Sequence, residues 1–119
     1  MRKMWYLLDE NNNIVPTDDM FAADKLLGDI DRRRVGLTEI YGTKISTVFL
    51  CVDHNFRLGQ TPLLFETMIS SCDGFDIPER YHNWEAAETG HDKWVENVKR
   101  EKIQVLAMAE EITQNSGEN

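Results

Sequence analysis

The longest apolar stretch of the chain lies in its middle. Residues 45–52, ISTVFLCV, place apolar or small side chains at both odd and even positions. A strand without polar and apolar alternation belongs in the interior of a sheet, with both of its faces covered. Residues 62–69, PLLFETMI, have the same character and follow a loop that contains Gly59. The two segments predict a central antiparallel β-hairpin.

Shorter β-patterns precede this hairpin. Residues 5–8, WYLL, predict a short strand, residues 10–13 a polar turn, and a second extended piece ends at Pro16. The β-branched residues between positions 35 and 40 predict another strand. The sequence YGTK, residues 41–44, is typical of a tight turn that would join this strand to the central one.

The C-terminal third of the chain changes to a helical period. Apolar side chains recur there at spacings of three, four or seven residues, and Asn83 is a candidate N-cap. This stripe consists of Trp84, Ala87, His91, Trp94, Val98, Val105, Met108 and Ile112. Gly90 costs about 1 kcal/mol relative to alanine inside a helix, so we expect a short helix joined to a longer one. Residues 114–119, QNSGEN, predict a disordered tail.

A short helix is also predicted near the N-terminus. It begins at Asp18, whose side chain can cap it, and runs to about Leu27, where Gly28 ends it. A chain of 119 residues is enough for one core, so residues 1–119 are expected to form a single domain. The predicted fold class is α+β: an antiparallel β-meander sheet with a short N-terminal helix and a C-terminal helical layer.

The chain is acidic, with a net charge of −8 at neutral pH. Such a charge repels duplex nucleic acid at long range, so no direct nucleic-acid binding is expected. Seven of the acidic residues lie between positions 9 and 31, where Lys25 is the only basic residue. This segment is either a solvated face that keeps the protein soluble, or a mimic of the phosphate backbone that occupies another protein's DNA-binding cleft.

Neither a membrane span nor a secretory signal is predicted. No apolar run approaches the roughly 18–20 residues that a membrane span needs. The N-terminus has a basic start, but only a few apolar residues precede its first acidic ones. Cys51 and Cys72 form no CxxC pair and are interpreted as reduced thiols of a cytoplasmic protein.

Residues 103–112, IQVLAMAEEI, carry apolar side chains on more than one helical face, because Ile103 and Leu106 lie off the main stripe. A helix with more apolar surface than one small sheet can cover indicates a partner surface. We expect a homo-oligomer, and the alternative is a core that is entirely intramolecular.

Metal binding and catalysis have weak signals. His54, His82 and His91 lack the spacing of metal motifs, and His91 on the apolar stripe is interpreted as a core histidine with a hydrogen-bonded ring. Asp53, His54 and Glu66 could form a small hydrolase site with a base and an orienting carboxylate. The other interpretation is that Glu66 anchors its strand through an arginine or backbone amides. No metal, cofactor or enzymatic activity is predicted.

Anion binding has the better signal. Guanidinium groups bind phosphates through paired hydrogen bonds, and aromatic faces stack on bases. The candidate ligand-binding residues are His54, Arg57, Phe75, Arg80, Tyr81 and Trp84, together with Arg33 and Arg34 from a second basic cluster. An alternative for that cluster is that it only neutralises Asp29 and Asp31.

Four segments resemble, in this order, a small protein family of tailed bacteriophages. They are STVFLCVDHNF (46–56), PLLFETM (62–68), RYHNW (80–84) and EAAETGH (85–91), and the resemblance covers about residues 33–95. ISSCDGFDIP, residues 69–78, stands where the family has a glycine-rich segment, so contacts made by that loop do not carry over. The resemblance implies a phage-encoded, non-enzymatic counter-defence protein in the host cytoplasm.

The predicted layout is also similar to that of the anti-Thoeris sponge proteins, which trap cyclic ADP-ribose isomers. That analogy implies a protein that binds and sequesters a cyclic nucleotide immune signal without cleaving it. Nanomolar binding is worth about −12 kcal/mol, which requires several guanidiniums, stacked aromatic rings and a closing loop, at a subunit interface. The alternatives are an acidic inhibitor of a host defence protein or nuclease, and the hydrolase described above.

Overall fold

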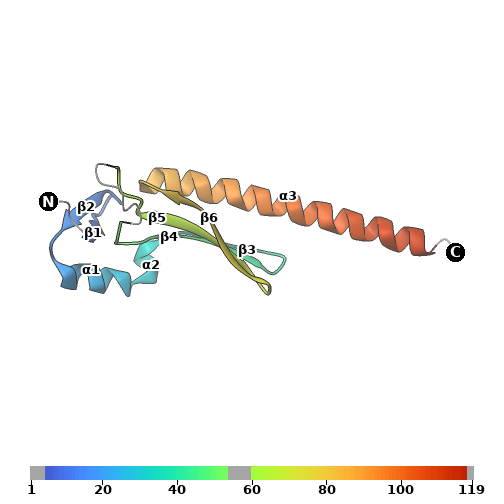
Figure 1. Cartoon of the computed structure of the whole chain (residues 1–119), viewed down its shortest axis with the longest axis horizontal. Helices are drawn as coiled ribbons and strands as arrows, with labels where there is room; N and C mark the ends of the chain where they lie inside the picture. Colours follow the sequence, from blue (N-terminus) through green and yellow to red (C-terminus); the bar gives the residue numbers. More distant parts are fainter. Residues whose placement is uncertain (1–4, 54–59, 118–119) are drawn as a thin grey trace.

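The structure is a computed structural model that describes residues 5–53 and 60–117. Its elements are β1 (Trp5–Leu8), β2 (Ile14–Thr17), α1 (Met20–Leu27), α2 (Ile30–Arg33), β3 (Arg34–Ile40), β4 (Thr43–Phe49), β5 (Phe65–Ser71), β6 (Gly74–Tyr81) and α3 (Trp84–Gly117). The strands β1 and β2 form a small sheet, and the main antiparallel sheet has the order β3-β4-β5-β6 (Figure 1). This architecture confirms the predicted α+β class.

The main sheet is a meander, because each strand pairs with the next one along the chain. The β4–β5 hairpin confirms the predicted central pair and places Phe49 opposite Phe65. The turn between β3 and β4 has positive φ at Tyr41 (47°) and Gly42 (84°). Two such residues in succession match the tight hairpin turns that follow the twist of the strands, as the sequence YGTK predicts.

The main core lies between the sheet and the first half of α3, which runs along one face of the sheet (Figure 1). Its fully or nearly buried members are Tyr6, Phe49, Cys51, Leu64, Phe65, Tyr81 and Ala87. The ring of Phe65 packs against Phe49 at 5.1 Å and edge-on against Trp84 at 6.1 Å between centroids. Aromatic contacts of this kind add to the burial of apolar area.

The expectation that the central strand is covered on both faces is wrong. Ile45 and Phe49 of β4 are fully buried toward α3, whereas Lys44 on the other face is exposed and Val48 is half-buried. The helices near the N-terminus do not cover that second face, because α1 packs against β1 and the short α2 contacts one end of β4. We call this second side of the main sheet the open face.

The central strand also ends earlier than its apolar sequence predicts. Cys51 has φ of 63°, which turns the chain toward β1, where the backbone carbonyl of Cys51 accepts a 2.9 Å hydrogen bond from Tyr6. Val52 then forms an isolated bridge with Trp5. The apolar residues after Phe49 therefore join the small sheet to the main one instead of extending β4.

Helix α3 is continuous, so the predicted break at Gly90 is wrong. A Cβ atom at Gly90 would collide with the ring of Tyr81, so the glycine makes room for that ring. The predicted N-cap is confirmed, because Asn83 Oδ1 accepts a 2.7 Å hydrogen bond from the backbone of Ala86. The helix continues to Gly117, into the segment that the sequence predicts as a tail.

The N-terminal helix α1 is capped one residue later than predicted. Asp19 Oδ1 accepts hydrogen bonds from the backbone of Phe21 and Ala22, both at 3.1 Å, and Gly28 follows the helix as predicted. No helix within residues 5–53 and 60–117 combines the length and the apolar character that crossing a bilayer requires.

Candidate functional site

A chain of hydrogen bonds runs beneath α3 and crosses all four strands of the main sheet. The Nε2 atom of His91 lies 3.0 Å from Oγ1 of Thr38 on β3, and its Nδ1 atom lies 2.8 Å from Oγ1 of Thr47 on β4. The Thr47 hydroxyl is 2.6 Å from that of Thr67 on β5, which is 2.9 Å from the hydroxyl of Tyr81 on β6. Every hydroxyl and ring nitrogen in this chain thus has a partner.

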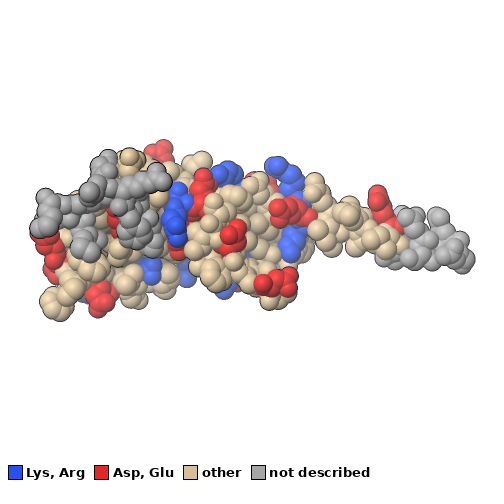
Figure 2. All heavy atoms as spheres, viewed as in Figure 1, with Lys and Arg blue, Asp and Glu red and all other residues tan. Residues whose placement is uncertain are grey.

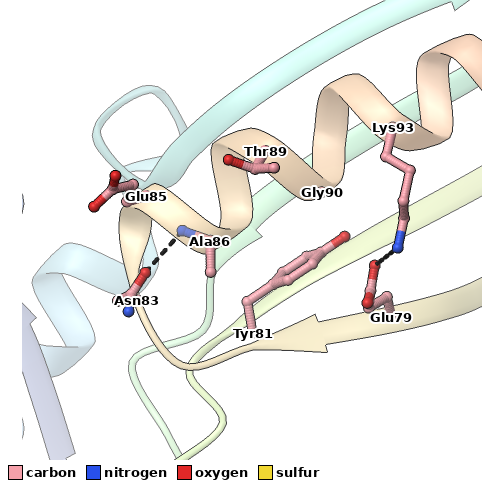
Figure 3. A pocket seen from close by; sticks show the side chains of 8 residues that line it. All are labelled: Glu79, Tyr81, Asn83, Glu85, Ala86, Thr89, Gly90 and Lys93. Atoms are coloured by element: carbon pink, nitrogen blue, oxygen red, sulfur yellow. Dashed lines mark hydrogen bonds and ion pairs between the residues drawn. The ribbon is translucent and has the colours of Figure 1, made fainter.

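At its outer end the chain meets a charged cluster. The hydroxyl of Tyr81 also points toward the carboxylate of Glu79 (Figure 3). Glu79 Oε1 accepts a 2.6 Å hydrogen bond from Lys93 Nζ and a 3.0 Å bond from the indole nitrogen of Trp94. The hydrogen bond from Lys93 is the main reason why the pKa of Glu79 is lowered. The cluster ties β6 to the third turn of α3.

The titratable groups of the hydrogen-bond chain, His91 and Tyr81, are not suited to proton transfer near neutral pH. Burial lowers the pKa of His91 from its ordinary 6.5 and raises the pKa of Tyr81 from its ordinary 10.0. A general acid or base works best with a pKa close to the working pH, and these shifts move away from it. The neutral, doubly hydrogen-bonded His91 confirms its interpretation as a core histidine.

A hollow of about 470 Å³ opens beside the chain's outer end, between β6 and the first turns of α3 (Figure 3). It is lined by Glu79, Tyr81, Asn83, Glu85, Ala86, Thr89, Gly90 and Lys93. Figure 3 shows the Tyr81 ring lying under α3, with its hydroxyl toward Glu79 and Lys93. Two carboxylates and a single ammonium group, which is paired with Glu79, line the hollow, so its charge does not favour a phosphate.

The open face carries a row of charged residues. Arg34 on β3 pairs with Val48, Val48 with Glu66, and Glu66 with Arg80 on β6. Residues that pair directly across antiparallel strands point to the same side of a sheet. Neighbouring strands lie about 4.8 Å apart, so the backbones of Arg34 and Arg80 are separated by about 14 Å.

Only one end of this row is held by an ion pair within it. Arg80 Nε lies 3.4 Å from Glu66 Oε2, and the Glu66 side chain is 13 % exposed. This contact confirms the interpretation that Glu66 is anchored by an arginine. At the other end, Arg34 contacts Asp31 at 3.4 Å, and its buried Nε atom has no hydrogen-bond partner among the described residues. An unsatisfied buried donor costs stability. The Arg34 side chain as a whole is 35 % exposed, so its terminal nitrogens make it a candidate for binding a ligand.

Apolar side chains accompany the row on the same face. Phe75 pairs with Ser70, which lies two residues beyond Met68 on the open side of β5. The Phe75 side chain is 70 % exposed, and Leu37 on β3 is 43 % exposed. The open face thus combines two guanidiniums with an exposed aromatic ring.

The remaining predicted residues lie elsewhere. Tyr81 and Trp84 are on the α3 side of the sheet, in or beside the core. Arg33 is not part of the row, because its side chain donates hydrogen bonds to the backbone carbonyls of Leu27 and Phe49. His54 and Arg57 lie outside the described residues. The structure therefore places Arg34, Phe75 and Arg80 on one face of the main sheet and separates them from the predicted aromatic pair.

The three arginines at positions 32–34 have different partners. Arg33 Nη1 donates to the Phe49 carbonyl at 3.0 Å, and its Nε donates to the Leu27 carbonyl at 3.1 Å. Arg32 Nη1 donates to Asn12 Oδ1 at 2.7 Å. These two arginines connect α2 to the β1–β2 turn and to β4. Of the three, Arg34 forms an ion pair with Asp31, as the alternative interpretation of the cluster predicts.

The predicted hydrolase residues have structural contacts. Asp53 Oδ1 accepts a 3.0 Å hydrogen bond from the backbone of Leu63, and Glu66 points to the open face. Burial raises the pKa of the Cys51 thiol, which disfavours the nucleophilic thiolate. No three histidine, cysteine or acidic residues among positions 5–53 and 60–117 are grouped as metal ligands.

The threonines of the hydrogen-bond chain and Glu79 are not among the residues singled out from the sequence. A signal was present, since Thr47 and Thr67 occupy inward positions of two apolar strands, where a hydroxyl needs a buried partner.

Comparison with known proteins gives no identification: no protein-family model, curated protein or solved structure matches this chain.

Proposed function

We propose that this protein is a non-enzymatic binding protein that captures a nucleotide-type molecule on its open face and holds it uncleaved. The observation that carries the proposal is the row that ends in Arg34 and Arg80. A guanidinium can bind a phosphate through paired hydrogen bonds, and the backbones of the two arginines lie about 14 Å apart on the same face, so that two long side chains can reach one ligand between them.

The surface beside the two arginines supports the same class of ligand. Every nucleobase has a flat face that can stack on an aromatic side chain, and Phe75 presents an exposed ring on this face of the sheet. Val48 and Met68 are half-buried between the outer strands, so they offer apolar contact for a sugar or a base. Glu66 between the arginines offers an acceptor for hydroxyl groups.

Binding without cleavage is supported by the chemistry of the described residues. The histidine, the tyrosine and the glutamate of the hydrogen-bond chain have pKa values that are shifted away from neutrality. Asp53 is bonded to a backbone amide, and Cys51 is buried. An acid–base or nucleophilic mechanism requires a group that is both activated and accessible.

In its finer form, the proposal follows the resemblance to the phage family and the analogy with sponge proteins. The ligand is then a cyclic nucleotide immune signal of the cyclic ADP-ribose type, and the protein is a phage counter-defence factor in the host cytoplasm. A flat face on one subunit buries too little of a small ligand for tight binding. The protein is therefore proposed to act as a homo-oligomer.

Calorimetric titration with cyclic ADP-ribose isomers and cyclic oligonucleotides tests this proposal. We expect binding that weakens at least tenfold in Arg34→Gln and in Arg80→Gln, and that is unchanged in Lys25→Gln, which alters an exposed residue of α1. Ligand recovered intact after heating the complex separates binding from hydrolysis. No heat with any of these ligands at micromolar protein would overturn the proposal.

A second candidate function has its own observation. Helix α1 exposes Phe21 (82 %) and Met20 (53 %) beside Asp18 and Asp24, next to an apolar hollow of about 300 Å³. An exposed aromatic residue within an acidic surface suits an inhibitor of a host defence protein or nuclease. Affinity capture from host lysate would then yield a stoichiometric partner, which the variant Asp18→Lys/Asp24→Lys fails to retain. Asp19 is left unchanged because it caps α1.

A further inference from the structure

The second half of α3 leaves the rest of the molecule. Beyond Val98 the helix extends past the ends of the β-hairpins into solvent (Figure 1), and the molecule is 71 Å long and 28 Å wide. We call residues 99–112 the stem. Five large apolar side chains of the stem are 50–65 % exposed: Ile103, Val105, Leu106, Met108 and Ile112. Such a concentration of exposed apolar side chains marks an interaction surface.

One side of the stem continues the stripe that the sheet covers. Ala87, His91 and Val98 are buried against the sheet, and Val105 and Ile112 follow Val98 at intervals of seven residues. Seven residues are about two helical turns, so all of these side chains lie on nearly the same side of α3. The side that the sheet covers in one half of the helix is uncovered in the other half.

We infer that a second copy of this chain covers the stem, with the two stems packed antiparallel about Val105. The inference rests on the self-association included in the proposed function, and it names the surface and the orientation. Val98 and Ile112 lie seven positions on either side of Val105. An antiparallel pair centred on Val105 therefore places Val105 against its symmetry mate and brings Ile112 level with Val98 of the other copy, at the point where that helix leaves its sheet.

The charges of the stem favour this orientation. The end near the sheet, residues 99–102, carries three basic residues and one acidic residue, whereas the far end carries Glu110 and Glu111. Figure 2 shows Lys and Arg side chains gathered where the helix leaves the sheet. Antiparallel stems bring the basic end of each copy to the acidic end of the other. Parallel stems would align like charges, which is destabilising.

The shape of the molecule favours it as well. The sheet and the N-terminal elements lie at one end of the stem, so parallel stems would force two of these bulky parts into the same space (Figure 1). Antiparallel stems place them at opposite ends. Each stem then ends at the β-hairpin tips of the other copy, where Tyr41 is 72 % and Phe75 is 70 % exposed. A stem of about 21 Å needs such additional contacts, because short isolated helix pairs are marginal.

The oligomeric state of the full chain tests the surface. Sedimentation at tens of micromolar protein is expected to show a dimer. Val105→Asp places two carboxylates against each other at the symmetry axis and is expected to weaken association at least tenfold. Ala107→Asp is the matched control, because residue 107 lies on the side of the helix opposite to Val105, and it should remain dimeric. Far-ultraviolet circular dichroism verifies that both variants are folded.

Cross-linking tests the orientation. In a Cys72→Ser background, where Cys51 is buried, Glu101→Cys and Ala109→Cys lie four positions on either side of Val105. A short bismaleimide is expected to link the two variants in a mixture, and to link neither variant to itself. Efficient linking within a single variant, or no link in the mixture, would overturn the antiparallel arrangement.

The outcomes separate this inference from the ligand proposal. A monomeric wild-type protein overturns both the inference and the self-association on which it rests. A dimer that survives Val105→Asp overturns the inference alone. A dimer that dissociates in Val105→Asp, in a protein that gives no heat with any nucleotide, supports the inference and overturns the ligand.

Discussion

The imidazole ring of His91 occupies the space that a side chain at Gly36 would need. A Cβ atom at Gly36 would lie 2.8 Å from the Nε2 and Cδ2 atoms of that ring. Gly90 has the same relationship to the ring of Tyr81, the other aromatic member of the hydrogen-bond chain. The chain under α3 therefore depends on two glycines that leave room for its rings.

Gly36→Ala should lower the free energy of unfolding by about 1–3 kcal/mol, because the added methyl group has to displace a ring that is hydrogen-bonded on both sides. The matched control is Gly28→Ala, where φ is −77° and the nearest atom to a new Cβ is 3.7 Å away. That change should be neutral or stabilising by up to about 1 kcal/mol. Urea denaturation measures both, and equal effects would contradict the packing argument.

Gly90→Ala tests the same idea inside a helix. Helix propensity alone predicts that alanine stabilises α3 by about 1 kcal/mol. The collision with the Tyr81 ring predicts the opposite sign, a loss of about 1–3 kcal/mol. Thr89→Ala, at the exposed neighbouring position, should change stability by less than about 0.5 kcal/mol. A Gly90→Ala protein that is more stable than the wild type would refute the role given to this glycine.

Gly90 also shows how far local rules reach. The period of the apolar stripe and the cap at Asn83 were enough to predict the start and direction of α3. The prediction of a break was wrong because helix propensity describes an isolated helix. In the folded protein, the absence of a side chain at Gly90 leaves room for the ring of Tyr81 on β6. Strand β6 itself gave no β-signal, since GFDIPERY contains a proline and three charged residues on an edge strand.

The sequence was enough to predict which residue types form the candidate site, but not where in the fold they lie. Arg34, Phe75 and Arg80 belong to segments that are far apart in the sequence, and only the strand register places them on one face. Both outer strand pairs contain a register shift, and a shift of one residue moves a side chain to the other face. Tyr81 is adjacent to Arg80 and points to the opposite side, because successive side chains of a strand alternate between the two faces.

The stability of the protein should depend on the protonation of His91. Burial lowers the pKa of His91 in the folded protein, whereas the unfolded chain takes up this proton near pH 6.5. Below pH 6.5 the unfolded state therefore binds more protons, and the free energy of unfolding falls as the pH decreases, by at most about 1.4 kcal/mol per pH unit. The nearby Asp92 carboxylate opposes this effect, because it raises the pKa of His91.

Urea denaturation between pH 7.5 and 5.5 measures this dependence. His91→Gln keeps a polar side chain between Thr38 and Thr47 but cannot titrate, so its stability should be lower at every pH and should change less over the same interval. Glu79, whose pKa is lowered from its ordinary 4.5, does not titrate in this window. An identical pH slope in the variant and in the wild type would rule out His91 as the source.

The neighbouring arginines Arg33 and Arg34 should separate stability from binding. Arg33→Gln removes charged donors from two backbone carbonyls, so it should cost about 1.5–3 kcal/mol of stability and leave nucleotide affinity unchanged in the folded protein. Arg34→Gln removes only an ion pair with the exposed Asp31, worth less than about 1 kcal/mol, but should weaken binding at least tenfold. Denaturation and calorimetry on the same two variants should therefore show a loss of stability in Arg33→Gln and a loss of affinity in Arg34→Gln. If Arg34→Gln lost stability but no affinity, the open face would not be the binding surface.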